Sequence, residues 1–311
     1  MRLTIPLILL IAIPTLAIVI VSSSPITLID ALGRNVTIFN YPPKKVIALT
    51  PAIAESVCVM NCSKLVATVQ PVDWPAQLVN ATGSGRVTII GTFWMPNIEK
   101  IALLEPDLVI ADEGADLRMI GKLNELGFPV LFTKGGACDS IGCIERDLTL
   151  IGKAIGELDR AGEVVKWIEE NVTKASEESL KYPLVKVVIL FYPFSWGIYA
   201  VGNGTFISDL VNKLNAVNLI GQLGWPRITK EKLLSLNADV VILLSGKGID
   251  PQGAVKDAKA LGLRAKRICV IYGTYADVVQ RPGPRISQAP WILLKALHAL
   301  VKDPSGLYCS G

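Results

Sequence analysis

Few side chains in this chain of 311 residues could carry acid–base or metal chemistry. His298 is the only histidine, and it lies in a stretch of alanine and leucine typical of a helix. A His-rich zinc or iron site is therefore excluded, and a Ser-His-Asp or Cys-His mechanism would depend on this one residue. We predict no enzyme, no catalytic residue, no metal site and no intrinsic cofactor.

Cysteines offer a second kind of chemistry. Two pairs that are close in sequence are disulfide candidates, Cys58/Cys62 and Cys138/Cys143, with buried thiols as the alternative. Gly135 and Gly136 let the loop of the second pair bend, which favours a bond there. Cys269 lies inside an apolar run, so we expect a buried free thiol. Zinc is disfavoured because these spacings without histidine are poor ligand patterns.

Aromatic side chains and arginines gather in loops instead. Asp73-Trp74-Pro75, Phe93-Trp94 and Trp225-Pro226-Arg227 are examples. A tryptophan in an exposed loop has no core to fill, so contact with a flat ligand is one reason for its presence, and packing as a lid over a core is the alternative. The expected ligand-binding residues are Trp74, Phe93, Trp94, Tyr192, Phe194, Trp196, Trp225, Tyr275, Arg281 and Arg285.

Alternating strand-like and helix-like patterns must position these loops. Short apolar runs predict strands at 46–49, 65–69, 108–111, 130–132, 185–191, 240–244 and 268–272. Helical patterns cover 98–104, 117–126, 206–214 and 291–300. This alternation indicates an α/β fold with mainly parallel sheets. Loops at the carboxyl ends of such strands face a common cleft, which is where a small-molecule site is expected.

An internal repeat divides the chain into two similar lobes. Residues 97–110 match residues 229–242 with a constant offset of 132, including a capping residue, a glutamate two places later and an aspartate before the strand. Between the repeats, residues 159–181 form a long helical pattern that Tyr182-Pro183 ends. We predict three-layer α/β lobes at 25–157 and 183–311, joined by a connecting helix at 158–182.

The first 24 residues indicate export. Arg2 precedes an apolar run from Leu3 to Val21, and a serine-rich stretch follows. This pattern predicts a signal peptide or a membrane anchor, and the length of the run slightly favours an uncleaved anchor. An extracytoplasmic location follows, at the cell surface or in the periplasm. Five glycosylation sequons begin at Asn35, Asn61, Asn80, Asn171 and Asn203. The net charge of +4 is too mild to predict nucleic-acid binding, and we expect a monomer.

Several motifs together resemble the substrate-binding proteins of ABC importers, in the class whose lobes are joined by one long helix. These are residues 29–38, Lys45–Pro51 followed by Glu55, residues 96–110 and residues 199–207. The resemblance covers about residues 26–302 and is specific in the order and spacing of the motifs. It implies a binding protein for cobalamin, haem or a ferric siderophore, and an ABC transporter permease with its cytoplasmic ATPase as partner. It also implies that Glu99 and Glu231 dock into permease arginines.

Details of the loops favour cobalamin among these metal chelates. Leu223-Gly224-Trp225-Pro226 and Asp73-Trp74-Pro75 resemble loops of cobalamin binders, whereas the acids at Asp112-Glu113 depart from them. A ferric siderophore or haem is the alternative ligand, and an anchored metal-cofactor enzyme or sensor domain is the alternative class. The arginines at 281 and 285 would pair with an anionic chelate in a siderophore binder.

Overall fold

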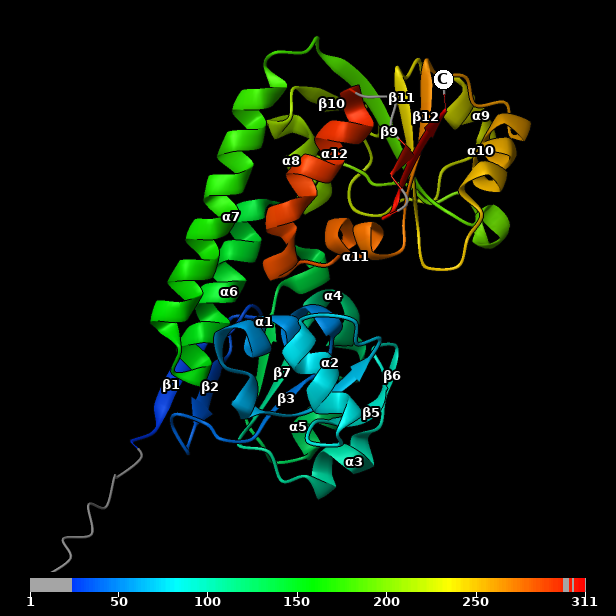
Figure 1. The fold of residues 1–311 in the computed structure, drawn as a ribbon. Coiled ribbons are helices and arrows are strands. Elements are labelled where there is room, and N and C mark those ends of the chain that lie inside the picture. Colours follow the sequence, from blue (N-terminus) through cyan, green and yellow to red (C-terminus); the bar gives the residue numbers. More distant parts are fainter. Residues whose placement is uncertain (1–23, 299–301, 304, 311) are drawn as a thin grey trace, which may run out of the picture.

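The computed structural model describes residues 24–298, 302–303 and 305–310. Two α/β lobes lie one above the other, and the long helix α7 (Leu158–Ser179) runs along one side of both (Figure 1). The fold confirms the predicted class of two mainly parallel α/β lobes joined by one long helix. The predicted leader at 1–24 falls almost wholly outside the described residues. Among the helices that are described, none combines the length and apolar character needed to cross a membrane.

The first lobe contains a six-stranded sheet in the order β6-β5-β4-β3-β7-β8, parallel except for β6. A separate antiparallel hairpin, β1-β2, precedes it. The strands are β1 (Ile26–Ile29), β2 (Asn35–Ile38), β3 (Val46–Ala48), β4 (Leu65–Gln70), β5 (Thr88–Thr92), β6 (Met95–Pro96), β7 (Leu108–Asp112) and β8 (Val130–Thr133). The α-helices of this lobe are α1 (Pro51–Asn61), α2 (Ala76–Gly83), α3 (Ile98–Leu103), α4 (Glu113–Asp116), α5 (Ile120–Glu125) and α6 (Ile141–Ile155).

The sheet of the second lobe has the order β10-β9-β11-β12-β14-β13, in which β14 is antiparallel to both neighbours. Its four parallel strands β10-β9-β11-β12 correspond to β4-β3-β7-β8 of the first lobe, and the remaining strands differ. Its strands are β9 (Val185–Phe191), β10 (Ala216–Asn218), β11 (Val240–Ser245), β12 (Arg267–Tyr272), β13 (Lys302–Asp303) and β14 (Leu307–Ser310). Its α-helices are α8 (Phe206–Lys213), α9 (Lys230–Leu234), α10 (Pro251–Ala260), α11 (Thr274–Gln280) and α12 (Ala289–His298). Short 3₁₀ turns include η4 (Phe194–Trp196) and η5 (Pro284–Gln288).

The two halves of the internal repeat have the same local structure. The side chains of Asn97 and Thr229 cap α3 and α9 by accepting a hydrogen bond from the third residue of each helix. The carboxylate of Asp107 accepts hydrogen bonds from the backbone N–H groups of Lys44 and Lys45, and that of Asp239 accepts one from Lys186. Each aspartate therefore ties the start of its own strand to the start of the neighbouring strand.

All six cysteines form disulfides, Cys58–Cys62, Cys138–Cys143 and Cys269–Cys309. The two candidate pairs are confirmed, but the expectation of a free thiol at Cys269 is wrong. Strand β14 returns antiparallel beside β12 and places Cys309 directly opposite Cys269 in the register. The apolar run around Cys269 gave no sign of that partner, which lies forty residues away.

Candidate functional site

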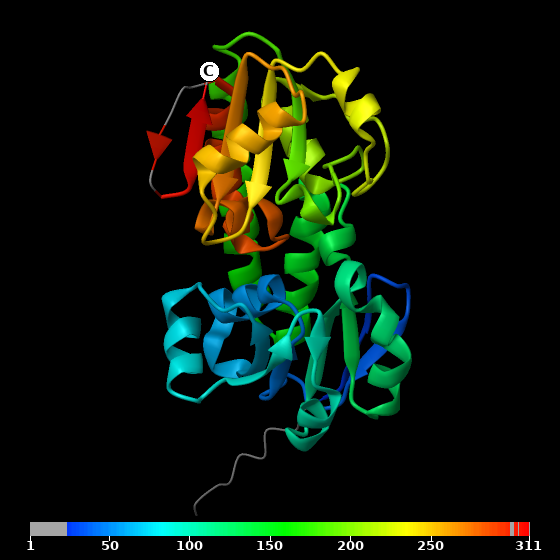
Figure 2. The same ribbon diagram turned by 90° about the vertical axis from the view of Figure 1, so that its right-hand side faces the viewer.

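A cavity of about 450 Å³ opens between the two lobes. Its polar floor and aromatic walls come from both lobes, and the lining residues are Thr50, Pro51, Ala52, Pro71, Phe93, Trp94, Asp112, Gly114, Ala115, Gly136, Phe206, Trp225, Gly246, Asp277, Gln280, Arg281 and Pro282. Figure 2 views the molecule from the side away from α7, with the lobes stacked across this region. A hollow of about 520 Å³ in the second lobe has no aromatic lining, so the interlobe cavity is the better candidate.

Aromatic rings form the outer walls of the cavity. Phe93 and Trp94 lie between β5 and β6, and their ring centroids are 4.3 Å apart. On the opposite lobe, Trp225 and the buried Phe206 form a T-shaped pair with their ring centroids 6.0 Å apart. Trp94 remains 58% exposed and Trp225 38% exposed. Because neither ring is buried in a hydrophobic core, these two tryptophans on facing lobes can contact both sides of a flat ligand.

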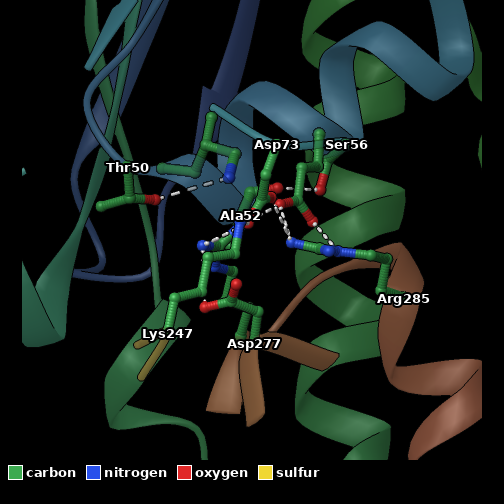
Figure 3. Close-up of polar contacts among 10 residues, drawn as sticks. Thr50, Ala52, Ser56, Asp73, Lys247, Asp277 and Arg285 are labelled. Carbon is green, nitrogen blue, oxygen red and sulfur yellow. Dashed lines mark hydrogen bonds and ion pairs between the residues drawn. The ribbon is translucent and has the colours of Figure 1, made fainter. Parts of the chain in front are cut away.

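A cluster of ionised side chains joins the lobes at the floor of the cavity (Figure 3). Glu55 on α1 and Asp73 after β4 belong to the first lobe, whereas Arg281 after α11 and Arg285 on η5 belong to the second. The Nε and Nη2 atoms of Arg285 donate to the two carboxylate oxygens of Glu55 at 3.0 and 2.6 Å. Arg285 also donates to Asp73 at 3.0 Å. This bidentate pairing fixes the relative position of the two lobes.

Arg281 is held by the same acids. Its Nη1 atom donates to Glu55 at 2.6 Å and to Asp73 at 2.8 Å, and its Nη2 atom lies 2.9 Å from Asp277. Lys247 adds a further ion pair to the cluster, with its Nζ atom 3.1 Å from Asp73. Each buried charge in the cluster therefore has at least one opposite partner, as burial requires.

The carboxyl groups of the ion cluster differ in the direction in which their pKa values are shifted. Burial raises the pKa of the Glu55 carboxyl, although Arg285 and Arg281 oppose the rise. Burial, reinforced by hydrogen bonding with Asp73 and by the Asp73 charge, raises the pKa of Asp277 to about 6. For Asp73 burial acts in the same direction, but the hydrogen bond with Asp277 and the two arginines outweigh it and hold its pKa well below the usual range. Asp73 and Asp277 thus behave as a pair in which Asp277 keeps the proton.

Asp112 contributes a buried carboxylate to the cavity lining. It caps α4 by accepting a hydrogen bond from Ala115 N–H, and it also accepts one from Gly136 N–H at 3.0 Å. An added Cβ at Gly135, which has φ +50°, would lie 2.0 Å from this carboxylate, so only glycine fits there. Burial raises the pKa of Asp112 to about 6 despite these hydrogen bonds.

The ten predicted ligand residues separate into three groups. Phe93, Trp94, Trp225 and Arg281 line the cavity. Trp74 and Arg285 lie in the interlobe ion cluster, where the guanidinium carbon of Arg285 stands 5.5 Å from the Trp74 ring. The remaining residues are outside the lining: Tyr192, Phe194 and Tyr275 pack against hydrophobic cores, and Trp196 on η4 is 77% exposed. Their roles in binding stay predictions.

The sequence did not reveal the acids of the site as functional. Glu55 and Asp73 stand there only as parts of motifs, and Asp277 belongs to none of the motifs. One signal was available for Glu55, since it is an acid within the otherwise apolar helix α1, where it is almost wholly buried. A buried acid of that kind needs a partner.

The predicted docking glutamates lie on the short helices α3 and α9, at opposite ends of the two-lobed molecule (Figure 1). Both side chains are exposed. The backbone N–H of Glu231 and the hydroxyl of Thr229 hold the pKa of the Glu231 carboxyl below its ordinary value, so it is charged near neutral pH.

Two lobes around an aromatic cleft, with a single helix spanning both, define a two-lobed ligand-binding protein. The chain belongs to the periplasmic binding protein family, whose model matches residues 46–264. It is 25% identical over 284 residues to an uncharacterised ABC transporter substrate-binding lipoprotein of Bacillus subtilis. The aligned region covers 88% of this chain and 86% of that protein. It is 22% identical over 260 residues to the vitamin B12-binding protein of Vibrio parahaemolyticus, covering 82% and 90% of the two chains.

A solved structure shows the same fold. A periplasmic heme-binding protein from Pseudomonas aeruginosa superposes with a TM-score of 0.69 at 20% identity, covering 86% of this chain and 98% of that one. The shared fold alone does not distinguish between these ligands.

Proposed function

We propose that this protein is the extracytoplasmic substrate-binding component of an ABC importer and that it carries a corrinoid such as cobalamin. Its similarity to an importer lipoprotein and to a vitamin B12-binding protein supports the class. Three disulfides support a location outside the reducing cytoplasm. The partners are then the permease with its ATPase, and the protein binds its ligand without transforming it.

The composition of the cavity lining carries the choice of ligand. Among the described residues that line it, none is histidine, tyrosine, cysteine or methionine, the usual axial ligands of a haem iron. Arg281 is the only basic residue in that lining, and acids of the protein already surround it. A haem or an anionic siderophore would find no ready partner there. A corrinoid arrives with its metal already enclosed and presents a flat macrocycle and neutral amides to Trp94 and Trp225.

Titration of tryptophan fluorescence tests this proposal. Cobalamin at micromolar concentration should quench the fluorescence, and haem or a ferric siderophore should do so only at much higher concentration. Trp225→Ala should weaken cobalamin binding about tenfold, because a tryptophan contact contributes a large contact area and about 1 kcal/mol of aromatic interaction. Trp167→Ala is the matched control, since Trp167 lies on helix α7 and is not part of the cavity lining.

Absence of quenching by cobalamin would reject the corrinoid assignment. Tight binding of haem or of a siderophore instead would keep the class of protein and change its cargo.

A further inference from the structure

Arg281 is the one basic side chain that the cavity offers, yet most of its donors are taken. Its two terminal nitrogens bond to Glu55, Asp73 and Asp277 at 2.6, 2.8 and 2.9 Å. The side chain is only 12% exposed. A ligand that binds the two terminal nitrogens of this guanidinium must therefore displace one of the three carboxylates.

The displaced acid would have little access to solvent. The Glu55 side chain is 2% exposed and Asp73 is 12% exposed, so neither carboxylate can exchange its arginine for bulk water. The lobes also approach closely beside the cluster, where a Cβ added to Gly283 would come within 3.2 Å of the Ala52 carbonyl oxygen. Without Arg281, Glu55 would keep only Arg285 as a partner, and Asp73 would keep Arg285 and Lys247. Loss of part of the charge compensation in a buried cluster is unfavourable.

The balance of charges around the cavity floor does not favour binding of an anion. Four acids lie at or beside it, Glu55, Asp73, Asp112 and Asp277, against the three bases Arg281, Arg285 and Lys247. Lys247 pairs with Asp73, and Arg285 is buried against Glu55. Each of the three bases is thus already paired with a carboxylate, and Nη1 of Arg285, which has no hydrogen-bond partner among the described residues, is buried.

We propose that Glu55 and Asp73 are specificity-determining residues, which make the cavity reject anionic ligands by neutralising Arg281 from the opposite lobe. The inference deepens the proposed function and rests on it for the nature of the ligand. It assigns the ion cluster a role in selection by charge, besides its role in holding the lobes together. Neutral or cationic planar chelates are accepted, and chelates with exposed carboxylates are excluded.

Two porphyrins that share one macrocycle test the proposal directly. One carries four carboxylates and the other four alkylpyridinium cations, so they differ in charge while presenting the same flat ring. The wild-type protein should bind the cationic porphyrin at least tenfold more tightly. Asp73→Asn and Glu55→Gln should each shift this ratio at least tenfold toward the anionic porphyrin, because each variant frees Arg281 from one negative charge.

Two further variants identify the cause. Glu170→Gln removes the same charge from an exposed pair on helix α7 and should leave the ratio within twofold of wild type. Adding Arg281→Gln to Asp73→Asn should abolish the gain, since the freed guanidinium is then missing. An unchanged ratio in both Asp73→Asn and Glu55→Gln would overturn the proposal, and so would failure of both porphyrins to bind.

A measurement on the unmodified protein covers the case in which the variants do not fold. Binding of the anionic porphyrin should strengthen when salt rises from about 20 to about 200 mM, because salt screens repulsion by the acids. Weakening with salt would mean that an unpaired cation attracts the ligand, which contradicts the proposal. A failure of cobalamin to bind would count only against the proposed cargo, because the porphyrin ratio does not depend on it.

Discussion

At the scale of single residues, the acids of the interlobe cluster matter as much as the aromatic walls. Tryptophans in loops could be predicted as ligand contacts from the sequence because a large ring in a loop has no core to fill. The roles of Glu55 and Asp73 could not be found in this way, since they meet Arg281 and Arg285, more than two hundred residues away in sequence, only when the two lobes come together. Of the aromatic residues predicted to bind ligand, Phe93, Trp94 and Trp225 line the cavity, whereas its charge balance depends on tertiary structure.

Asp277 gives the protein a dependence of stability on pH. Its folded pKa of about 6 lies above the ordinary value of 3.8 because of burial and the neighbouring Asp73. The folded state therefore holds the proton more tightly, and this group's contribution to the free energy of unfolding falls as pH rises from about 4 to about 6. At about 1.4 kcal/mol per pKa unit, the fall is on the order of 2 kcal/mol.

Urea unfolding at a series of pH values measures this effect. Asp277→Asn should flatten the decline relative to wild type, whereas Glu170→Gln on helix α7 should reproduce the wild-type curve. An identical slope in Asp277→Asn would show that the shared proton with Asp73 does not form.

At the scale of elements, continuous apolar runs in the sequence located the longer buried strands well, whereas the short strands at the sheet edges were missed. All seven expected strands are present within one residue at each end. The short strands β6, β10 and β13 are two or three residues long and carry too little pattern to detect. Strand β14 was also missed, and with it the partner of Cys269, because its antiparallel pairing with β12 is set by topology and not by local sequence.

The Cys269–Cys309 disulfide should stabilise the second lobe more than the two short disulfides stabilise the first. Its loop spans forty residues, for which the chain-entropy model gives about 4 kcal/mol, against about 2 kcal/mol for a loop of four or five. Replacing both cysteines with serine should lower the free energy of unfolding by up to that amount. Thermal unfolding of this double variant beside a Cys58→Ser/Cys62→Ser control compares the two, and equal losses would contradict the expectation.

At the scale of the whole molecule, the repeat of 132 residues predicted two lobes and their common topology. It did not predict the ion pairs that join the lobes, because the buried charges on α1 and η5 lie outside both repeated segments. The same repeat places one exposed glutamate near the far end of each lobe, on α3 and α9.

Glu99→Arg and Glu231→Arg together should abolish uptake of the ligand while leaving its affinity for the purified protein unchanged. The physical reason is that arginines on a permease would meet like charges at both ends of the molecule. Transport in cells and fluorescence titration of the same variants measure the two quantities, with Glu170→Arg as a control for added positive charge. Uptake that survives the double reversal would reject docking through these residues.

The aspartate ties of the two repeats also set the mechanical path through the protein. A pull on helix α3 reaches Asp107 within a few residues, and its hydrogen bonds to Lys44 and Lys45 pass the load to the start of β3 in the core. Asp239 does the same from α9 through Lys186 to β9. Force applied at either outer helix is therefore delivered to the start of a strand inside the sheet of that lobe.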